Sequence, residues 1–141
     1  MDFELAGEHG FVRLSGLPAQ ATLINFWRSD CPPCVREMPV LAGLAHAGSV
    51  RVMAVAVQRP SDTLTAPESV ARALRSPVQL LHAPAEPRGI LARFGNVNGV
   101  LPYTTLLHAD RSICAKHAGE IDAAWVEAMV NRCHNAESGR R

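Results

Sequence analysis

The chain has 141 residues, 48% of them hydrophobic, and a formal net charge of +1. This length suits one domain with a real core, and the balanced charge gives no electrostatic case for nucleic acid or an anionic membrane as a partner. Four cysteines are too few for a disulfide scaffold, so we expect the core to carry the fold. The sequence has no run of about 18 apolar residues that would span a membrane.

The first half of the chain alternates predicted strands and helices. Residues 11–14 alternate like a short strand, and residues 21–27 form an apolar run typical of a buried strand. Apolar spacings of three and four predict an amphipathic helix over about residues 34–46, kinked at Pro39 because proline removes a helical hydrogen bond. Residues 50–57 read as a second buried strand.

The second half begins with a polar link around residues 60–62. Thr65 and Glu68 then match a capping box that would open a helix to about Arg75. The other predicted elements are a short strand at 78–81, a short helix at 89–94, strands at 103–107 and 113–117, a last helix capped by Asp122, and a frayed tail at 135–141.

Strands that alternate with helices predict parallel strands joined by crossover helices, and the later hairpin adds an antiparallel edge. We therefore predict an α/β fold in one domain over residues 1–141, with its core at about 10–134. Its central mixed sheet would be flanked by helices, with a short N-terminal β extension and a central helix-strand insertion.

The chemical signature is Cys31-Pro32-Pro33-Cys34, where a buried strand meets a helix. A thiol exchanges disulfides only as its thiolate, and the free N–H groups and partial positive charge of a helix start favour that anion. Cys31 falls at the helix cap and Cys34 inside the first turn. We predict that Cys31 is the nucleophile, that Cys34 resolves the mixed disulfide, and that this redox-active disulfide needs no cofactor.

The alternative for this pair is metal binding, as half of a zinc site or as a module that delivers Cu(I) or zinc. The missing second Cys-x-x-Cys and the strand-helix context favour redox chemistry, and we predict no metal ligand. Cys114 and Cys133 stay open: they either form a second disulfide between the hairpin strand and the last helix or remain buried thiols.

The stretch from Phe26 to Pro39 resembles the active-site segment of the thioredoxin fold. It is most similar to the extracytoplasmic TlpA-like thiol-disulfide oxidoreductases. Glu37 three residues after the second cysteine, the proline at position 39, and Leu101-Pro102 before a strand agree with that family.

The resemblance implies a protein-disulfide oxidoreductase that works as a reductant in cytochrome c or copper-centre maturation. Its partners would be protein dithiol or disulfide substrates and a membrane or periplasmic electron donor, with no nucleic acid; we expect a monomer. The first residues, Met1–Leu5, lack a signal-peptide pattern, so they fit a cytosolic protein or one whose targeting segment is absent here. The resemblance favours a periplasmic or extracytoplasmic location, with an anchor through such a segment.

Within the site, the resemblance implies that Glu37 assists proton transfer at the buried sulfur. It also implies that Pro102 is cis and that a substrate segment binds along the Leu101 backbone. Trp27 is a candidate substrate contact, although core packing is the preferred interpretation. The alternatives are a solvated Glu37 and a trans proline at the start of a strand.

Two positions depart from the family's pattern. Asp30 stands where a tryptophan usually precedes the first cysteine, and its carboxylate should oppose thiolate formation at Cys31 unless Arg28 offsets it. Asn25 stands at the thioredoxin position of a buried aspartate and does not titrate, which leaves Glu37 as the nearby carboxylate for a proton relay.

Overall fold

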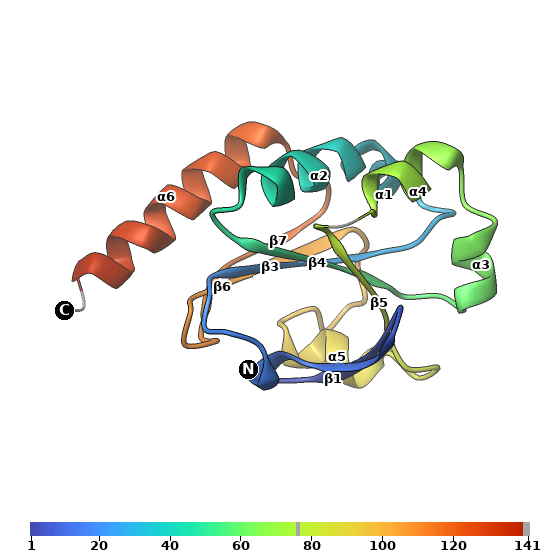
Figure 1. The fold of residues 1–141 in the computed structure, drawn as a ribbon, viewed down its shortest axis with the longest axis horizontal. Coiled ribbons are helices and arrows are strands. Elements are labelled where there is room, and N and C mark those ends of the chain that lie inside the picture. Colours follow the sequence, from blue (N-terminus) through green and yellow to red (C-terminus); the bar gives the residue numbers. More distant parts are fainter. Residues whose placement is uncertain (76, 140–141) are drawn as a thin grey trace.

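The structure is a computed structural model that describes residues 1–75 and 77–139. Its strands form one seven-stranded mixed sheet in the order β2-β1-β5-β4-β3-β6-β7 (Figure 1). The strands are β1 (Glu4–Gly7), β2 (Gly10–Arg13), β3 (Thr22–Trp27), β4 (Arg51–Ala56), β5 (Gln79–His82), β6 (Tyr103–Leu107) and β7 (Ile113–Ala118).

Helices cover both faces of this sheet. In Figure 1, α1, α2, α4 and α6 lie above the sheet and α5 lies below it. The helices are α1 (Pro32–Arg36), α2 (Met38–Ala47), α3 (Pro60–Leu64), α4 (Glu68–Ala73), α5 (Arg88–Arg93) and α6 (Ala123–Gly139), with a short 3-10 helix η1 at Leu14–Gly16. None of the helices in the described residues is both long and apolar enough to cross a membrane.

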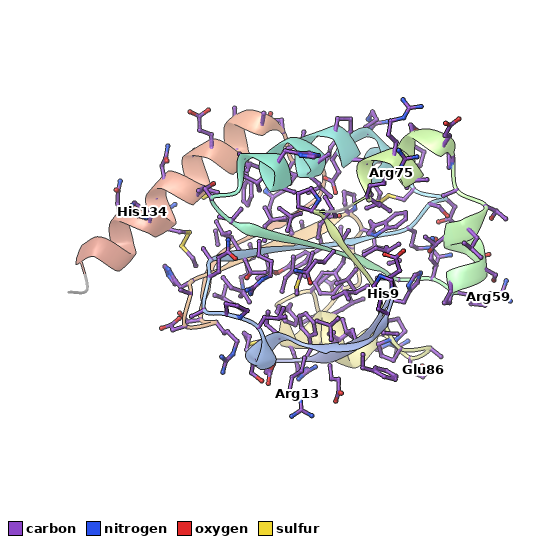
Figure 2. All side chains as sticks on the ribbon, viewed as in Figure 1. His9, Arg13, Arg59, Arg75, Glu86 and His134 are labelled. Atoms are coloured by element: carbon purple, nitrogen blue, oxygen red, sulfur yellow. A yellow bond between two sulfur atoms is a disulfide. The ribbon has the colours of Figure 1, made fainter. Side chains whose placement is uncertain are left out.

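The core consists of two apolar clusters separated by the sheet, and the side-chain alternation of β3 divides its residues between them. Leu23 and Trp27 belong to the cluster under α1, α2, α4 and α6. Ile24 and Phe26 belong to the cluster that packs against α5. Because both faces are covered, β3 is buried along its whole length and reads as an apolar run. Figure 2 shows side chains filling both layers, with charged ones such as Arg13 and Arg59 on the outside.

The sheet is parallel at its centre and antiparallel toward its edges, as predicted. β3 pairs in parallel with β4 and antiparallel with β6, where Phe26 lies opposite Tyr103. The hairpin of β6 and β7 forms one edge and the N-terminal hairpin of β1 and β2 forms the other. Since β6 runs against β3, the residues before Tyr103 lie at the end of the sheet where β3 stops and the cysteine segment begins.

The predicted kink near Pro39 is present and divides the helix at Glu37, whose backbone stays helical and whose carbonyl still accepts from the Leu41 N–H at 3.2 Å. α1 ends at Arg36, α2 begins at Met38, and Glu37 lies between them. Pro39 falls in the first turn of α2, where an N–H has no helical partner to lose.

The predicted capping box at Thr65 and Glu68 is wrong. Residues assigned to a polar link form α3, and Thr65 ends that helix with its hydroxyl donating to the Asp62 carbonyl at 3.2 Å. α4 starts after Pro67, so Thr65 is too far back to cap it. Pro60 explains the difference, because a proline with fixed φ is suited to start the earlier helix.

Both ends of the chain are more regular than the sequence indicates. β1 was not predicted, since Glu-Leu-Ala-Gly has no strand preference; it exists because it pairs with both β2 and β5. The tail predicted to be frayed at 135–141 continues α6 as far as Gly139. Residues 140–141 of that prediction lie outside the described residues.

Candidate active site

The cysteine pair begins the first helix after the central strand. Cys31 is the N-cap of α1, and its sulfur accepts a hydrogen bond from the backbone N–H of Cys34 at 3.3 Å. The two cysteines form a disulfide with their Cα atoms 5.2 Å apart. Cys31 is half-buried, whereas Cys34 is 0% exposed. The structure therefore offers one sulfur to a partner and hides the other, which fits the predicted nucleophile and resolver.

Glu37 is buried, so it is not the solvated helix charge that the sequence left open. Its side chain is 1% exposed. One carboxyl oxygen accepts from the Asn25 amide, and the other accepts from the backbone N–H of Ile121 at 3.2 Å. Burial raises the pKa of Glu37 to about 7, against the two hydrogen bonds, which lower it; the nearby Glu120 raises it further.

A buried polar chain continues from Glu37 into the sheet. Asn25 donates through the same amide nitrogen to the Thr104 hydroxyl at 3.0 Å, and both residues are 0% exposed. They lie opposite each other in the register of β3 and β6. Tyr103, which stands between Pro102 and Thr104, points to the other face and donates to the Phe94 carbonyl at 2.8 Å. The alternation of β6 therefore leaves Thr104 facing the site.

A surface ion pair, Arg36–Glu120, lies beside the buried Glu37 carboxyl. Arg36, the residue before Glu37, donates through Nη2 to the Glu120 carboxylate at 2.8 Å. Glu120 directly precedes Ile121, whose N–H holds Glu37. The sequence alone does not predict the roles of Glu120, Ile121 and Thr104, because their partners lie 79 to 84 positions away and no periodicity links them.

The loop before β6 is held rigidly beside the cysteine end of the sheet. The Leu101–Pro102 peptide bond is cis, as the resemblance implies. The Asn96 side chain both accepts from the N–H of Val100 at 3.0 Å and donates to its carbonyl at 2.8 Å. Gly95 has a φ of +93°, and a Cβ there would meet the Tyr103 hydroxyl at 2.7 Å, so only glycine fits.

Leu101 is the open position of this loop. Its side chain is half-buried, and among the described residues its backbone N–H and carbonyl have no hydrogen-bond partner. Pro102 is buried, and its carbonyl accepts from the Gly119 N–H at 2.8 Å. The Leu101 backbone can thus accept an extended segment, which agrees with the predicted substrate position.

Trp27 is a core residue and not a substrate contact. It is 0% exposed and packs in the same cluster as Cys34 and Met38. The candidate role of Trp27 as a substrate contact is therefore corrected, and its burial agrees with the preferred core-packing interpretation. Its position at the buried end of β3 supports the cysteine turn from below.

The anomalous Asp30 is paired. The Arg28 guanidinium donates through Nε to one Asp30 oxygen at 2.9 Å and through Nη2 to the other at 3.3 Å. Hydrogen bonding from Arg28 holds the pKa of Asp30 below its ordinary value. The cation that the sequence named as a candidate to offset Asp30 therefore lies in direct contact with it.

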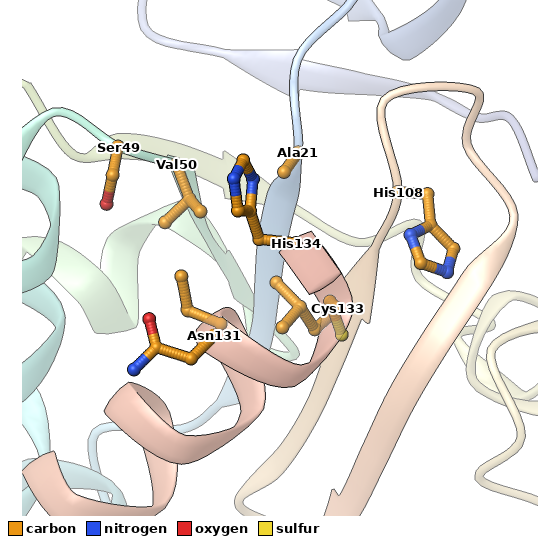
Figure 3. A pocket seen from close by; sticks show the side chains of 9 residues that line it. Ala21, Ser49, Val50, His108, Asn131, Cys133 and His134 are labelled. Atoms are coloured by element: carbon orange, nitrogen blue, oxygen red, sulfur yellow. The ribbon is translucent and has the colours of Figure 1, made fainter. Parts of the chain in front are cut away.

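The second cysteine pair also forms a disulfide, which resolves the alternative left open by the sequence. Cys114 on β7 and Cys133 on α6 join with their Cα atoms 5.9 Å apart. A hollow of about 300 Å³ lies between α6, the residues just before β3 and β4, and the end of β6. Cys133, His108 and His134 are among the residues that line it (Figure 3). In the described residues, no group of three or more His, Cys, Asp or Glu side chains is arranged to hold a metal ion.

Solved structures with the same fold are numerous. The exposed lipoprotein thioredoxin of Streptococcus pneumoniae is 21% identical over 94% of this chain and 99% of its own, with a TM-score of 0.74. A thioredoxin-related protein of Neisseria meningitidis is 24% identical over 94% and 99%, with a TM-score of 0.73. A secreted Mycobacterium tuberculosis disulfide oxidoreductase is 18% identical over 92% and 95%, with a TM-score of 0.71. These likenesses establish the thioredoxin fold.

A search of curated proteins found no match. A family model, described as the AhpC/TSA family, matches residues 1–116, which is most of the chain. This match and the shared fold confirm the resemblance predicted from residues 26–39. A thioredoxin fold with a Cys-x-x-Cys disulfide at a helix start is the architecture of a thiol-disulfide oxidoreductase. The chain belongs to the AhpC/TSA family of thioredoxin-like proteins.

Proposed function

We propose that this protein reduces disulfides of other proteins through Cys31 and Cys34, outside the cytoplasm. The observation that carries the proposal is the arrangement around the pair. A partly exposed cysteine caps a helix, the second cysteine is fully buried, and a buried carboxyl with a raised pKa follows it three residues later. Exchange chemistry needs these three parts: an accessible thiolate, a protected resolver and a proton acceptor.

The reaction has two steps. The Cys31 thiolate attacks one sulfur of the substrate disulfide, so that bond breaks and a mixed disulfide forms; the departing substrate thiolate takes up a proton. Cys34 then gives up its proton, and its thiolate attacks the Cys31 sulfur. The Cys31–Cys34 disulfide forms, the second substrate thiolate leaves, and two electrons have passed from this protein to its substrate.

Glu37 is the proton acceptor for Cys34 in this scheme. It follows Cys34 by three residues and is buried on the same side of the sheet as the resolver. A carboxyl with a pKa near 7 accepts and returns a proton near neutral pH with little driving force either way. Asn25 and the Ile121 N–H orient the carboxyl for this transfer.

The substrate segment would add to the protein along Leu101. The backbone groups of Leu101 are unpaired among the described residues, next to the cis peptide bond and at the cysteine end of the sheet. The same loop carries Val97, which is 75% exposed, and Val100, which is 42% exposed. An extended segment with an apolar side chain near its disulfide would suit this surface.

The second disulfide supports a location outside the cytoplasm. Disulfides such as Cys114–Cys133 persist in oxidising compartments and are rare in the cytosol. The similar proteins of Streptococcus pneumoniae and Mycobacterium tuberculosis are described as exposed and secreted. We propose a periplasmic or extracytoplasmic monomer, anchored through a segment outside this sequence. A membrane or periplasmic dithiol would return electrons to it, in service of cytochrome c or copper-centre maturation.

The test is reduction of insulin disulfides with dithiothreitol as electron source. We expect turnover by the intact protein and none by Cys31→Ala, while Cys34→Ala should trap a mixed disulfide through Cys31. The reduction potential of the pair should lie near −270 mV, the value for thioredoxin, and not near −120 mV. As the control, the intact protein and Cys31→Ala are titrated with Cu(I) and zinc. Metal uptake that depends on Cys31, in an intact protein that does not reduce insulin, would overturn the proposal.

A further inference from the structure

We propose that Arg28 is a positioning residue for the nucleophile: it binds the carboxylate of Asp30 and so allows the Cys31 thiolate to form directly beside an acidic residue. This inference rests on the proposed role of Cys31. It concerns Asp30, at which this chain departs from the family's pattern, and it assigns Arg28 a task in setting the reactivity of the sulfur.

The ion pair has the geometry of a two-pronged contact. Nε and Nη2 of Arg28 each donate to a different oxygen of Asp30, at 2.9 and 3.3 Å. Such a fork fixes the direction of the carboxylate as well as its distance. Lysine in place of arginine would supply the charge without the fork.

The arginine is itself anchored to the sheet. Its third nitrogen, Nη1, donates to the Val57 carbonyl at 3.0 Å, and the Val57 N–H donates to the Trp27 carbonyl at 2.9 Å. Next to it, the N–H and hydroxyl of Ser29 both donate to the Gln58 side chain at 2.9 Å. The segment just before Cys31 is therefore tied to the residues after β4, and the guanidinium does not depend on Asp30 for its place.

The surrounding charges leave Arg28 as the cation that faces Asp30. On the α3 side, Asp62 contributes a favourable charge to Arg28 and is paired with Arg59 at 3.4 Å. On the α1 side, Arg36 is bound to Glu120, and Glu37 is buried behind the pair. Because hydrogen bonding to Arg28 lowers the pKa of Asp30, that carboxylate is ionised throughout the range in which a cysteine titrates.

An unpaired carboxylate one residue from Cys31 would disfavour the thiolate. Two unit charges about 6 Å apart in water interact enough to move a pKa by about half a unit. Arg28→Gln should therefore raise the pKa of Cys31 by about half a unit, which lowers the thiolate fraction about threefold below that pKa. Asp30→Asn leaves the arginine unopposed and should lower the pKa by a similar amount.

The experiment follows the rate of Cys31 alkylation by iodoacetamide against pH. It uses the full chain with Cys34→Ser, in which Cys114 and Cys133 remain paired and one reactive thiol is left; mass spectrometry verifies that pairing. The Arg28→Gln and Asp30→Asn changes should move the midpoint in opposite directions. The double variant should return close to the parent, and Arg28→Lys should restore part of the shift. Added salt should shrink both single shifts, since the pair is exposed.

The matched control is Arg13→Gln, which breaks an exposed arginine–glutamate pair at the far edge of the sheet and should leave the midpoint unchanged. Equal midpoints in the parent and in both single variants would overturn the inference. The Arg28–Asp30 ion pair would then have only a structural role. Asp30→Asn keeps the arginine's anchor on Val57, so it remains informative if Arg28→Gln folds poorly. If the midpoints shift as expected but the intact protein, with Cys34 present, does not reduce insulin, the proposed function alone would be refuted.

Discussion

Cys31–Cys34 and Cys114–Cys133 place the same bond in two different settings. The first closes a three-residue separation at a helix cap, with a half-exposed sulfur, an ion pair on one side and a buried carboxyl on the other. The second spans 19 positions and joins edge strand β7 to α6, with Cys133 buried against the core.

The difference shows how surroundings divide the work between the two bonds. A sulfur is reactive when its thiolate is stabilised and a partner can reach it. The helix cap and the open Leu101 loop meet both conditions for the first pair. For the second pair, the long separation makes the bond most effective as a constraint on the unfolded chain.

Removal of the second disulfide should show the largest difference between the two pairs, because it should lower stability without lowering activity. In the loop-entropy model, a bridge across 19 positions contributes about 3 kcal/mol to the free energy of unfolding. The variant Cys114→Ala/Cys133→Ala should lose about that amount in urea unfolding while it keeps insulin reduction. Cys31→Ala should do the reverse. If the double variant were as inactive as Cys31→Ala, the second pair would take part in electron transfer, and the two disulfides would not differ in role.

Glu37 should give the site a pH dependence that the second disulfide lacks. Burial raises the pKa of Glu37 from the ordinary 4.5 to about 7, so the folded protein binds this proton more tightly than the unfolded chain does. This contribution is full below about pH 4.5 and is lost as the pH rises through 7. A shift of this size corresponds to on the order of 3 kcal/mol.

Urea unfolding at pH 4.5 and pH 8 measures that loss. In Glu37→Gln the difference in unfolding free energy between the two pH values should shrink by the Glu37 share, and the pH profile of thiol exchange should flatten near 7. The Glu68→Gln change on exposed α4 is the matched control. An unchanged exchange profile in Glu37→Gln would remove Glu37 from the mechanism.

Thr104→Val should produce the smallest effect. It removes one buried hydrogen bond to the Asn25 amide and keeps the side-chain shape, at a cost of about 1 kcal/mol in stability. Because Asn25 then orients Glu37 less firmly, the exchange pH profile should move slightly while the second disulfide is unaffected. Thr105→Val, which loses a bond to the Phe94 carbonyl on the other face, is the control; it should lower stability without moving the profile.

Local sequence was sufficient to predict the cysteine site and the order of the main elements. Cys31 and Cys34 depend on neighbours along the chain, namely an apolar strand before them and prolines that suit the first helical turn. The cis bond at Pro102 was implied by the family resemblance and not by the dipeptide itself, since most X–Pro bonds are trans. The capping box at Thr65 failed because two local signals competed, and the proline that starts α3 prevailed.

The pairings across the fold were decided only in three dimensions. Cys114 meets Cys133, Ile121 reaches Glu37, and Thr104 meets Asn25 because strand register and helix docking bring distant positions together. A sequence pattern records which side of an element is apolar, but it does not record which polar atoms will face each other across a core. The sequence by itself therefore determined where the redox chemistry lies and named Glu37 and Arg28 as candidates beside it. The tertiary structure decided that Glu37 is buried, that Arg28 binds Asp30 and that Cys114 bonds to Cys133, because these outcomes depend on packing and register.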